Sequence, residues 1–213
     1  MKKIAIIGAS GFSKDIKELI DEINKVFLQW KIAGFYDDNI KKGTEIYEDL
    51  ICLGSMKELM DIKENLDLVF SIENRKIVER IFMELRKKNN LCFPNLIHPK
   101  AYVSPTIELG KGNIIEAFSY ISCNVEIGGF NLINSYVLLG HDVKIKNYNS
   151  FMPKTQIAGC VTMEEHNFFG MNSGVVQNVK IGSNNKVLGF TFLTKSIQDN
   201  RKYFGVPAKK MNI

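Results

Sequence analysis

The chain has 213 residues, of which 45% are apolar and 24% are charged, and its formal net charge is +5. The length allows one large or two modest domains. The positive charge is mild and scattered, which disfavours nucleic acid as a partner and suits small anionic ligands better. The sequence contains no apolar stretch long enough for a transmembrane helix and does not begin with the pattern of a secretory signal, so we expect no membrane partner.

The first ninety residues alternate between short apolar strands and amphipathic helices. Strands are expected at residues 3–8, 31–36, 51–53 and 66–72, and helices after residue 14, at 56–62 and at 75–88. Strands that alternate with helices are typical of a small parallel sheet. We therefore predict a Rossmann-like α/β domain over residues 1–92.

Beyond this domain, an apolar residue recurs every six positions. The seventeen positions are Ile97, Val103, Leu109, Ile115, Ile121, Ile127, Ile133, Leu139, Ile145, Phe151, Ile157, Met163, Phe169, Val175, Ile181, Val187 and Leu193. A helix or an ordinary sheet does not have this period, whereas a hexapeptide β-helix does. Pro94 and Pro99 bracket the change of pattern, and proline is excluded from central strands. Residues 93–213 are therefore predicted to form a β-helix.

A second period sets the size of one coil. Asparagine recurs every eighteen residues, at positions 113, 131, 149, 167 and 185, and the two hexapeptides between successive asparagines carry different residues at the equivalent place. Three hexapeptides per coil give a triangular prism of about five coils, in which the asparagines can form a hydrogen-bonded column. Coils of this kind are stabilised by stacking on one another.

Two features of the N-terminal domain point to a ligand. The turn from Gly8 to Gly11 follows the first strand and precedes a helix, so its backbone N–H groups could bind phosphate. A plain tight connection is the alternative, because the full dinucleotide-binding pattern is absent. Asp37 and Asp38 follow the second strand at the edge where such sheets bind ligands, or form an ordinary solvated turn.

His141 is the candidate catalytic residue of the prism. It stands third in its hexapeptide, so we expect its ring to project outward from a corner, where a neighbouring subunit could meet it. Asp142 beside it could stabilise the imidazolium that forms on proton uptake. The alternative is a histidine that is exposed without a function.

The cysteines and histidines give no metal or disulfide pattern. Four cysteines, at positions 52, 92, 123 and 160, show no pairing or ligand spacing, which indicates packed thiols and a cytoplasmic location. His98, His141 and His166 do not fall on one column of the prism, so we expect no metal cofactor.

Several motifs together resemble a known family. They are the Gly8 to Gly11 turn, the sequence GFYDD at 34–38, the prism, His141 with Asp142, and the sequence GVPA at 205–208. The chain resembles the two-domain hexapeptide-repeat sugar acetyltransferases of the sialic acid O-acetyltransferase and bacillosamine N-acetyltransferase type. This resemblance implies a left-handed β-helix, a homotrimer, acetyl-CoA as cosubstrate and a nucleotide-linked sugar as acceptor.

The resemblance also implies site residues. His141 would be the general base, with Asp142 as its acidic neighbour. The nucleotide sugar would be held by Gly8, Ser10, Gly11, Asp37 and Asp38, and acetyl-CoA by Gly159, Gly174, Pro207, Lys209 and Lys210, with a lysine near the 3′-phosphate. Phe12 and Ser150 stand where the bacillosamine enzymes have histidines, so we expect a different acceptor sugar.

Our prediction is direct acetyl transfer from acetyl-CoA to a UDP- or dTDP-linked 4-amino-4,6-dideoxyhexose. The backbone N–H of Gly159 is the candidate donor to the oxyanion. The alternative activity is O-acetylation of sialic acid or of a surface-polysaccharide sugar. A hypothesis of another class is a trimeric binding scaffold without chemistry.

Overall fold

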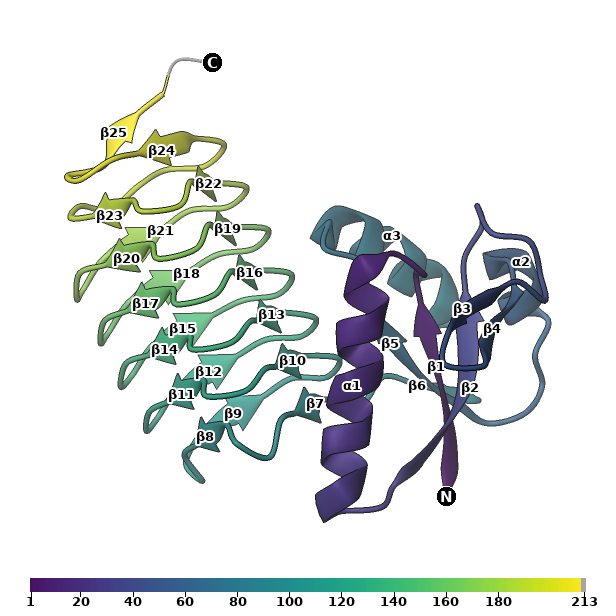
Figure 1. The fold of residues 1–213 in the computed structure, drawn as a ribbon. Coiled ribbons are helices and arrows are strands. Elements are labelled where there is room, and N and C mark those ends of the chain that lie inside the picture. The colour runs from purple at the N-terminus through teal and green to yellow at the C-terminus, as the bar shows by residue number, and fades with distance from the viewer. Residues whose placement is uncertain (212–213) are drawn as a thin grey trace. The chain divides into compact units, whose positions relative to one another are not determined.

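The computed structural model describes residues 1–211, which form two compact units that divide between Pro99 and Lys100 (Figure 1). The boundary predicted after residue 92 falls at the end of strand β6 (Leu91–Cys92). No helix among the described residues is long and apolar enough to cross a membrane.

The first unit contains a six-stranded sheet in the order β3-β4-β2-β1-β5-β6. Its strands are β1 (Lys2–Ile7), β2 (Trp30–Tyr36), β3 (Glu45–Tyr47), β4 (Leu50–Gly54), β5 (Leu66–Phe70) and β6, and its helices are α1 (Gly11–Val26), α2 (Met56–Met60) and α3 (Arg75–Leu85). All strand pairs are parallel except the β3–β4 hairpin. The predicted α/β domain is confirmed, with β3 and β6 as additions.

The sequence of this unit accounts for its elements. Strand β1 is apolar and β-branched, and its side chains from Ile4 to Ile7 are buried. Helix α1 buries Ile16, Leu19, Ile20 and Ile23, which share one face at helical spacing. Helix α2 begins with a capping box, in which the Ser55 hydroxyl and the Glu58 carboxylate each accept from the other's backbone N–H.

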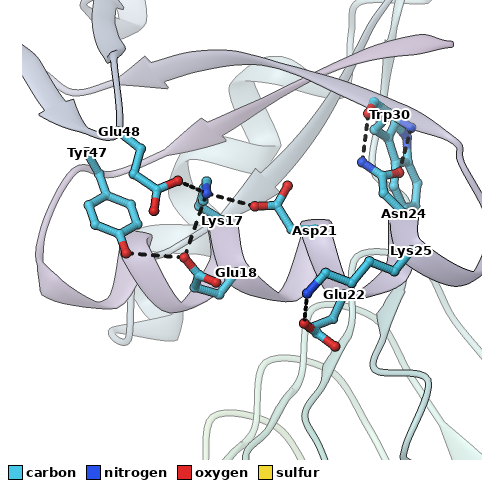
Figure 2. A network of polar contacts seen from close by, with 9 residues as sticks. All are labelled: Lys17, Glu18, Asp21, Glu22, Asn24, Lys25, Trp30, Tyr47 and Glu48. Carbon is cyan, nitrogen blue, oxygen red and sulfur yellow. Dashed lines mark hydrogen bonds and ion pairs between the residues drawn. The ribbon is translucent and has the colours of Figure 1, made fainter.

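A polar network ties α1 to the β3–β4 hairpin (Figure 2). The Lys17 ammonium is 2.8 Å from Asp21 and also pairs with Glu48, while the Tyr47 hydroxyl donates to Glu18 over 3.2 Å. Partial burial alone would lower the pKa of Lys17, but the hydrogen bonds to Asp21 and Glu48 raise it. The network therefore keeps Lys17 charged and holds the hairpin against the helix.

The second unit is a triangular prism built from strands of two residues. One sheet has the order β25-β24-β22-β19-β16-β13-β10-β7, the second β23-β20-β17-β14-β11-β8 and the third β21-β18-β15-β12-β9. The strands are β7 (Leu96–Ile97), β8 (Tyr102–Val103), β9 (Glu108–Leu109), β10 (Ile114–Ile115), β11 (Tyr120–Ile121), β12 (Glu126–Ile127), β13 (Leu132–Ile133), β14 (Leu138–Leu139), β15 (Lys144–Ile145), β16 (Ser150–Phe151), β17 (Gln156–Ile157), β18 (Thr162–Met163), β19 (Phe168–Phe169), β20 (Gly174–Val175), β21 (Lys180–Ile181), β22 (Lys186–Val187), β23 (Phe192–Leu193), β24 (Lys202–Phe204) and β25 (Lys209–Lys210).

The coil count follows the sequence closely. Strands β7 to β21 make five complete coils of three strands each, and β22, β23 and an isolated bridge at Ile197 make a sixth, counted over residues 1–211. Strand β24 then pairs with β22 and forms an antiparallel hairpin with β25, so the C-terminal turn packs on the last coil.

The column of asparagines forms the predicted ladder. The side-chain oxygen of Asn113 accepts from the backbone N–H of Asn131 over 2.9 Å. The corresponding bond joins each later asparagine of the column to the one before it, up to Asn185. All five asparagines are buried. Buried amides need such partners, so the ladder stabilises the stacking of coil on coil.

The corners of the prism share one backbone conformation. From Phe118 to Phe190, every sixth residue has φ between 54° and 63°. Glycine and asparagine adopt this left-handed region most easily, and other residues pay a small strain for it. A residue at this place in a hexapeptide is therefore held at a tight corner.

Candidate active site

The outward corner between β14 and β15 carries His141 and Asp142. The Nδ1 atom of His141 lies 2.7 Å from Oδ2 of Asp142, and the two side chains are 59% and 49% exposed. The predicted outward projection of the histidine ring is confirmed.

The hydrogen bond between His141 and Asp142 determines which ring nitrogen carries the proton in the neutral imidazole. The hydrogen bond from His141, and then that from Asn124, lower the pKa of the Asp142 carboxyl below its ordinary value. An ionised carboxylate can only accept, so Nδ1 of His141 carries the proton that is shared with Asp142. In a neutral ring, Nε2 is then left with its lone pair, as a general base requires.

The coil above this corner comes close to the ring. A Cβ atom added to Gly159 would lie 2.6 Å from Nε2 of His141 and 2.7 Å from Cε1. Glycine is therefore required there for the ring to keep its position. Among the hydrogen bonds of residues 1–211, the backbone N–H of Gly159 donates none, so it can serve a ligand beside Nε2.

A cysteine also lies at this corner, which the sequence analysis missed. Ligand atoms of His141, Asp142 and Cys160 all lie within 4.8 Å of one another. Cys160 follows Asp142 by eighteen residues, so the coil period itself was the signal that could have placed it. The expectation of packed thiols is correct for Cys52 and wrong for the other three cysteines, which are exposed.

A separate cavity of about 570 Å³ lies in the N-terminal unit at the carboxyl ends of β1, β2 and β5. Its lining includes four of the residues predicted to bind substrate, namely Gly8, Ser10, Asp37 and Asp38. Gly11 and Phe12 begin helix α1 and are not part of the lining. Ser71 and Arg80, which the sequence analysis did not single out, also line the cavity.

The two aspartates are engaged with the backbone of this cavity. Asp37 accepts from the N–H of Ala9 over 3.0 Å and from that of Asn39 over 2.8 Å. Asp38 accepts from the N–H of Met56 over 2.8 Å. The carboxylates therefore brace the glycine turn and the start of α2 at the edge of the cavity that they line.

The remaining predicted residues lie elsewhere. Ser150 is buried in β16, and Gly174 is buried in β20 beneath the ring of Phe192. Pro207, Lys209 and Lys210 belong to the exposed C-terminal hairpin. The structure thus forms one cluster of His141, Asp142, Gly159 and Cys160 and a second site around the glycine turn.

Comparisons with known proteins agree with this architecture. The profile of the PglD N-terminal domain matches residues 3–85. The structure is similar to PerB from Caulobacter crescentus in complex with CoA and GDP-perosamine, with 24% identity, a TM-score of 0.88 and coverage of 100% of this chain and 98% of that one. No curated protein matches.

Two further solved structures share the fold. The acetyltransferase domain of PglB from Neisseria gonorrhoeae is 22% identical, with a TM-score of 0.89 and coverage of 99% of this chain and 100% of that one. WeeI from Acinetobacter baumannii is 22% identical, with a TM-score of 0.87 and the same coverage. At these identities the likeness shows the fold, which is a small Rossmann-like domain followed by a left-handed parallel β-helix. The two domains agree with the sequence prediction, and the left hand agrees with what the resemblance implied.

Proposed function

We propose that the protein is an acetyl-CoA-dependent N-acetyltransferase that acts on a nucleotide-linked amino sugar. The observation that carries this proposal is the exposed His141–Asp142 pair, whose Nδ1 hydrogen bond leaves Nε2 able to accept a proton. Three further observations support it: the cavity at the glycine turn, the profile match over residues 3–85, and the likeness to PerB, which was solved with CoA and GDP-perosamine.

The proposed reaction is a direct displacement. The amine nitrogen attacks the carbonyl carbon of the thioester, Nε2 of His141 takes the proton that the nitrogen loses, and the C–S bond breaks to release CoA as a thiolate. Asp142 holds the ring in its tautomer and stabilises the imidazolium, which can then return the proton to the sulfur. The free N–H of Gly159 is the proposed donor to the oxyanion.

The nucleotide is proposed to bind in the N-terminal cavity. Helix α1 has no acidic residue in its first turn, and its N-cap, Ser10, makes no side-chain capping bond. The backbone N–H groups of Gly8 and Ala9 are already bound to Tyr36 and Asp37, so a phosphate there would be stabilised by the helix dipole and by the N–H groups that follow them in the chain. Asp37 and Asp38 hold the loops of the cavity, and Arg80 adds a cation to its lining.

The remaining features of the proposal come from the predicted resemblance. They are a homotrimer, CoA contacts from Gly174, Pro207, Lys209 and Lys210, and a role for Phe12 and Ser150 in the choice of acceptor. The reaction would take place in the cytoplasm. Light scattering tests the homotrimer, and the CoA dissociation constants of Lys209 and Lys210 variants test the proposed CoA contacts.

Release of free thiol from acetyl-CoA tests the proposed function. The purified protein would be incubated with UDP-, GDP- and dTDP-linked 4-amino-4,6-dideoxyhexoses, each paired with the 4-hydroxy sugar as control. We expect thiol release and an acetylated product with at least one amine and none with its hydroxyl partner. Thiol release with the hydroxy sugars would favour O-acetylation. If none of the tested sugars raises thiol release above the rate without enzyme, the binding scaffold is the hypothesis that remains.

Substitution of Gly159 by alanine tests whether the position of the His141 ring depends on the space left by this glycine in the next coil. The added methyl group would sit 2.6 Å from Nε2, so the ring must move. Since a displacement of about 1 Å at a catalytic group can cost roughly 100-fold, we expect a fall of this order in kcat. Gly189→Ala is a matched control elsewhere on the prism, where the nearest atom, a backbone oxygen, is 3.1 Å away. An unchanged kcat in Gly159→Ala would contradict the claim that catalysis depends on the present position of the His141 ring.

A further inference from the structure

We propose that His141, Asp142 and Cys160 form a binding site for a thiophilic divalent cation of the Zn²⁺ class, and that the bound cation blocks the base. Binding rests only on the geometry of the three side chains. The inhibitory consequence rests on the function proposed above.

The three side chains are already gathered. One ligand atom from each lies within 4.8 Å of the other two. In a tetrahedral zinc site with bonds of about 2.0–2.3 Å, neighbouring ligand atoms are about 3.3–3.8 Å apart. Small side-chain rotations are therefore enough to bring the three ligands onto one ion.

The backbone that carries them is fixed by the prism. Asp142 and Cys160 occupy the same corner in successive coils, with φ of 58° and 59°. The N–H of Cys160 donates to the carbonyl oxygen of His141 over 2.9 Å, which joins the two coils at this point. The Cα positions of the ligands therefore need not move when a cation binds.

The donor set selects the class of cation. Sulfur, imidazole nitrogen and a carboxylate oxygen are ligands that zinc accepts together, whereas magnesium and calcium prefer oxygen alone. The thiolate and the carboxylate balance the charge of a divalent ion, with the thiol proton released to solvent. Three protein ligands leave a fourth position for water.

The described residues contain a second cluster of possible ligand atoms, and a comparison with it supports the choice of the prism corner. Glu18, Asp21 and Glu48 also gather their oxygens, but the Lys17 ammonium lies among them and supplies the positive charge (Figure 2). At the prism corner the amide of Asn124 lies 3.2 Å from Oδ1 of Asp142, and the Lys144 ammonium, which also acts on Asp142, is paired with Glu126 over 2.6 Å.

A cation at this corner removes the base whichever ring nitrogen it takes. If it binds Nε2, the lone pair that accepts the amine proton is occupied. If it binds Nδ1, the ring proton moves to Nε2, which then has no lone pair. Acetyl transfer is therefore expected to fall with occupancy and to recover when the ion is chelated.

Cobalt absorption and zinc calorimetry on the full-length protein test the site directly. We expect Co²⁺ to give a sulfur-to-metal charge-transfer band and Zn²⁺ to bind one ion per chain. Cys160→Asn should abolish the band and weaken Zn²⁺ binding by roughly 100-fold or more. Asparagine suits this variant because it occupies the same corner at Asn178 in the next coil and at Asn124 two coils earlier. Cys160→Ser is the second variant, and Cys92→Ser, which removes an exposed thiol of the other unit, should leave both signals unchanged.

The activity measurement separates the two claims. Wild-type protein should lose at least nine-tenths of its thiol release in saturating Zn²⁺ and regain it with EDTA. The rate of Cys160→Asn, compared with and without Zn²⁺ against its own rate in EDTA, should change by less than twofold. A cobalt band that is missing, or one that persists in Cys160→Asn, would overturn the site. If the band behaves as expected but chelated protein transfers no acetyl group, the site stands and the proposed enzyme function fails.

Discussion

The protein with asparagine in place of His141 is expected to transfer acetyl groups roughly 10²–10⁴-fold more slowly than the wild type. Asparagine has no lone pair that can take up a proton at neutral pH, so the amine must lose its proton to solvent. The side chain is 59% exposed and packs little, so the unfolding midpoint should stay unchanged. Steady-state kcat from thiol release and a thermal melt measure the two quantities.

His166→Asn is the matched control for this variant. His166 also lies at a prism corner, with φ of 60°, but its ring stacks on Tyr148 and is not part of the cluster around His141. We expect this control to keep kcat within about twofold, since His166 has no role in the proposed chemistry. Equal losses in both variants would mean that the effect is structural, and no loss in His141→Asn would remove the proposed base.

The largest effect on stability is expected from Phe151→Ala. Phe151 is fully buried inside the prism and stacks on Phe169 of the next coil, with ring centroids 5.5 Å apart. Removal of a buried phenylalanine side chain costs about 3–5 kcal/mol, because a cavity is left behind. Coils depend on their neighbours, so the loss should lower the cooperativity of unfolding as well. Denaturant titration followed by circular dichroism measures the free energy of unfolding.

Phe190→Ala provides the comparison for the core variant. Phe190 is a corner residue whose exposed fraction is 64%, so its ring contributes little to the interior. We expect a change of about 0.5 kcal/mol or less. Similar losses in the two variants would contradict the description of the prism as a solenoid held together by its inner column.

The prism was predictable because its periodicity is strict. A six-residue apolar repeat and an eighteen-residue asparagine repeat specify three sides per coil, and the asparagine ladder follows from the same spacing. The two missed strands of the first unit have no comparable signal. β3 has three residues and β6 has two, and each is defined by its partner in the sheet and not by its own pattern.

The candidate sites were only partly predictable. His141 and Asp142 were found because they are adjacent in sequence, whereas Cys160 belongs with them only through the stacking of coils. The lack of pairing and ligand spacing led to the expectation of a packed thiol, which is wrong for Cys160 because its position at an outward corner decides its exposure. Ser71 and Arg80 join the N-terminal cavity through the sheet order β2-β1-β5, which sequence alone does not give.

A structure of the protein with CoA and the best amino sugar from the thiol assay tests the central claim most directly. We predict that the acceptor amine lies about 2.6–3.2 Å from Nε2 of His141, as a proton transfer requires. An acceptor nitrogen out of reach of this ring, with no water between them, would contradict the account.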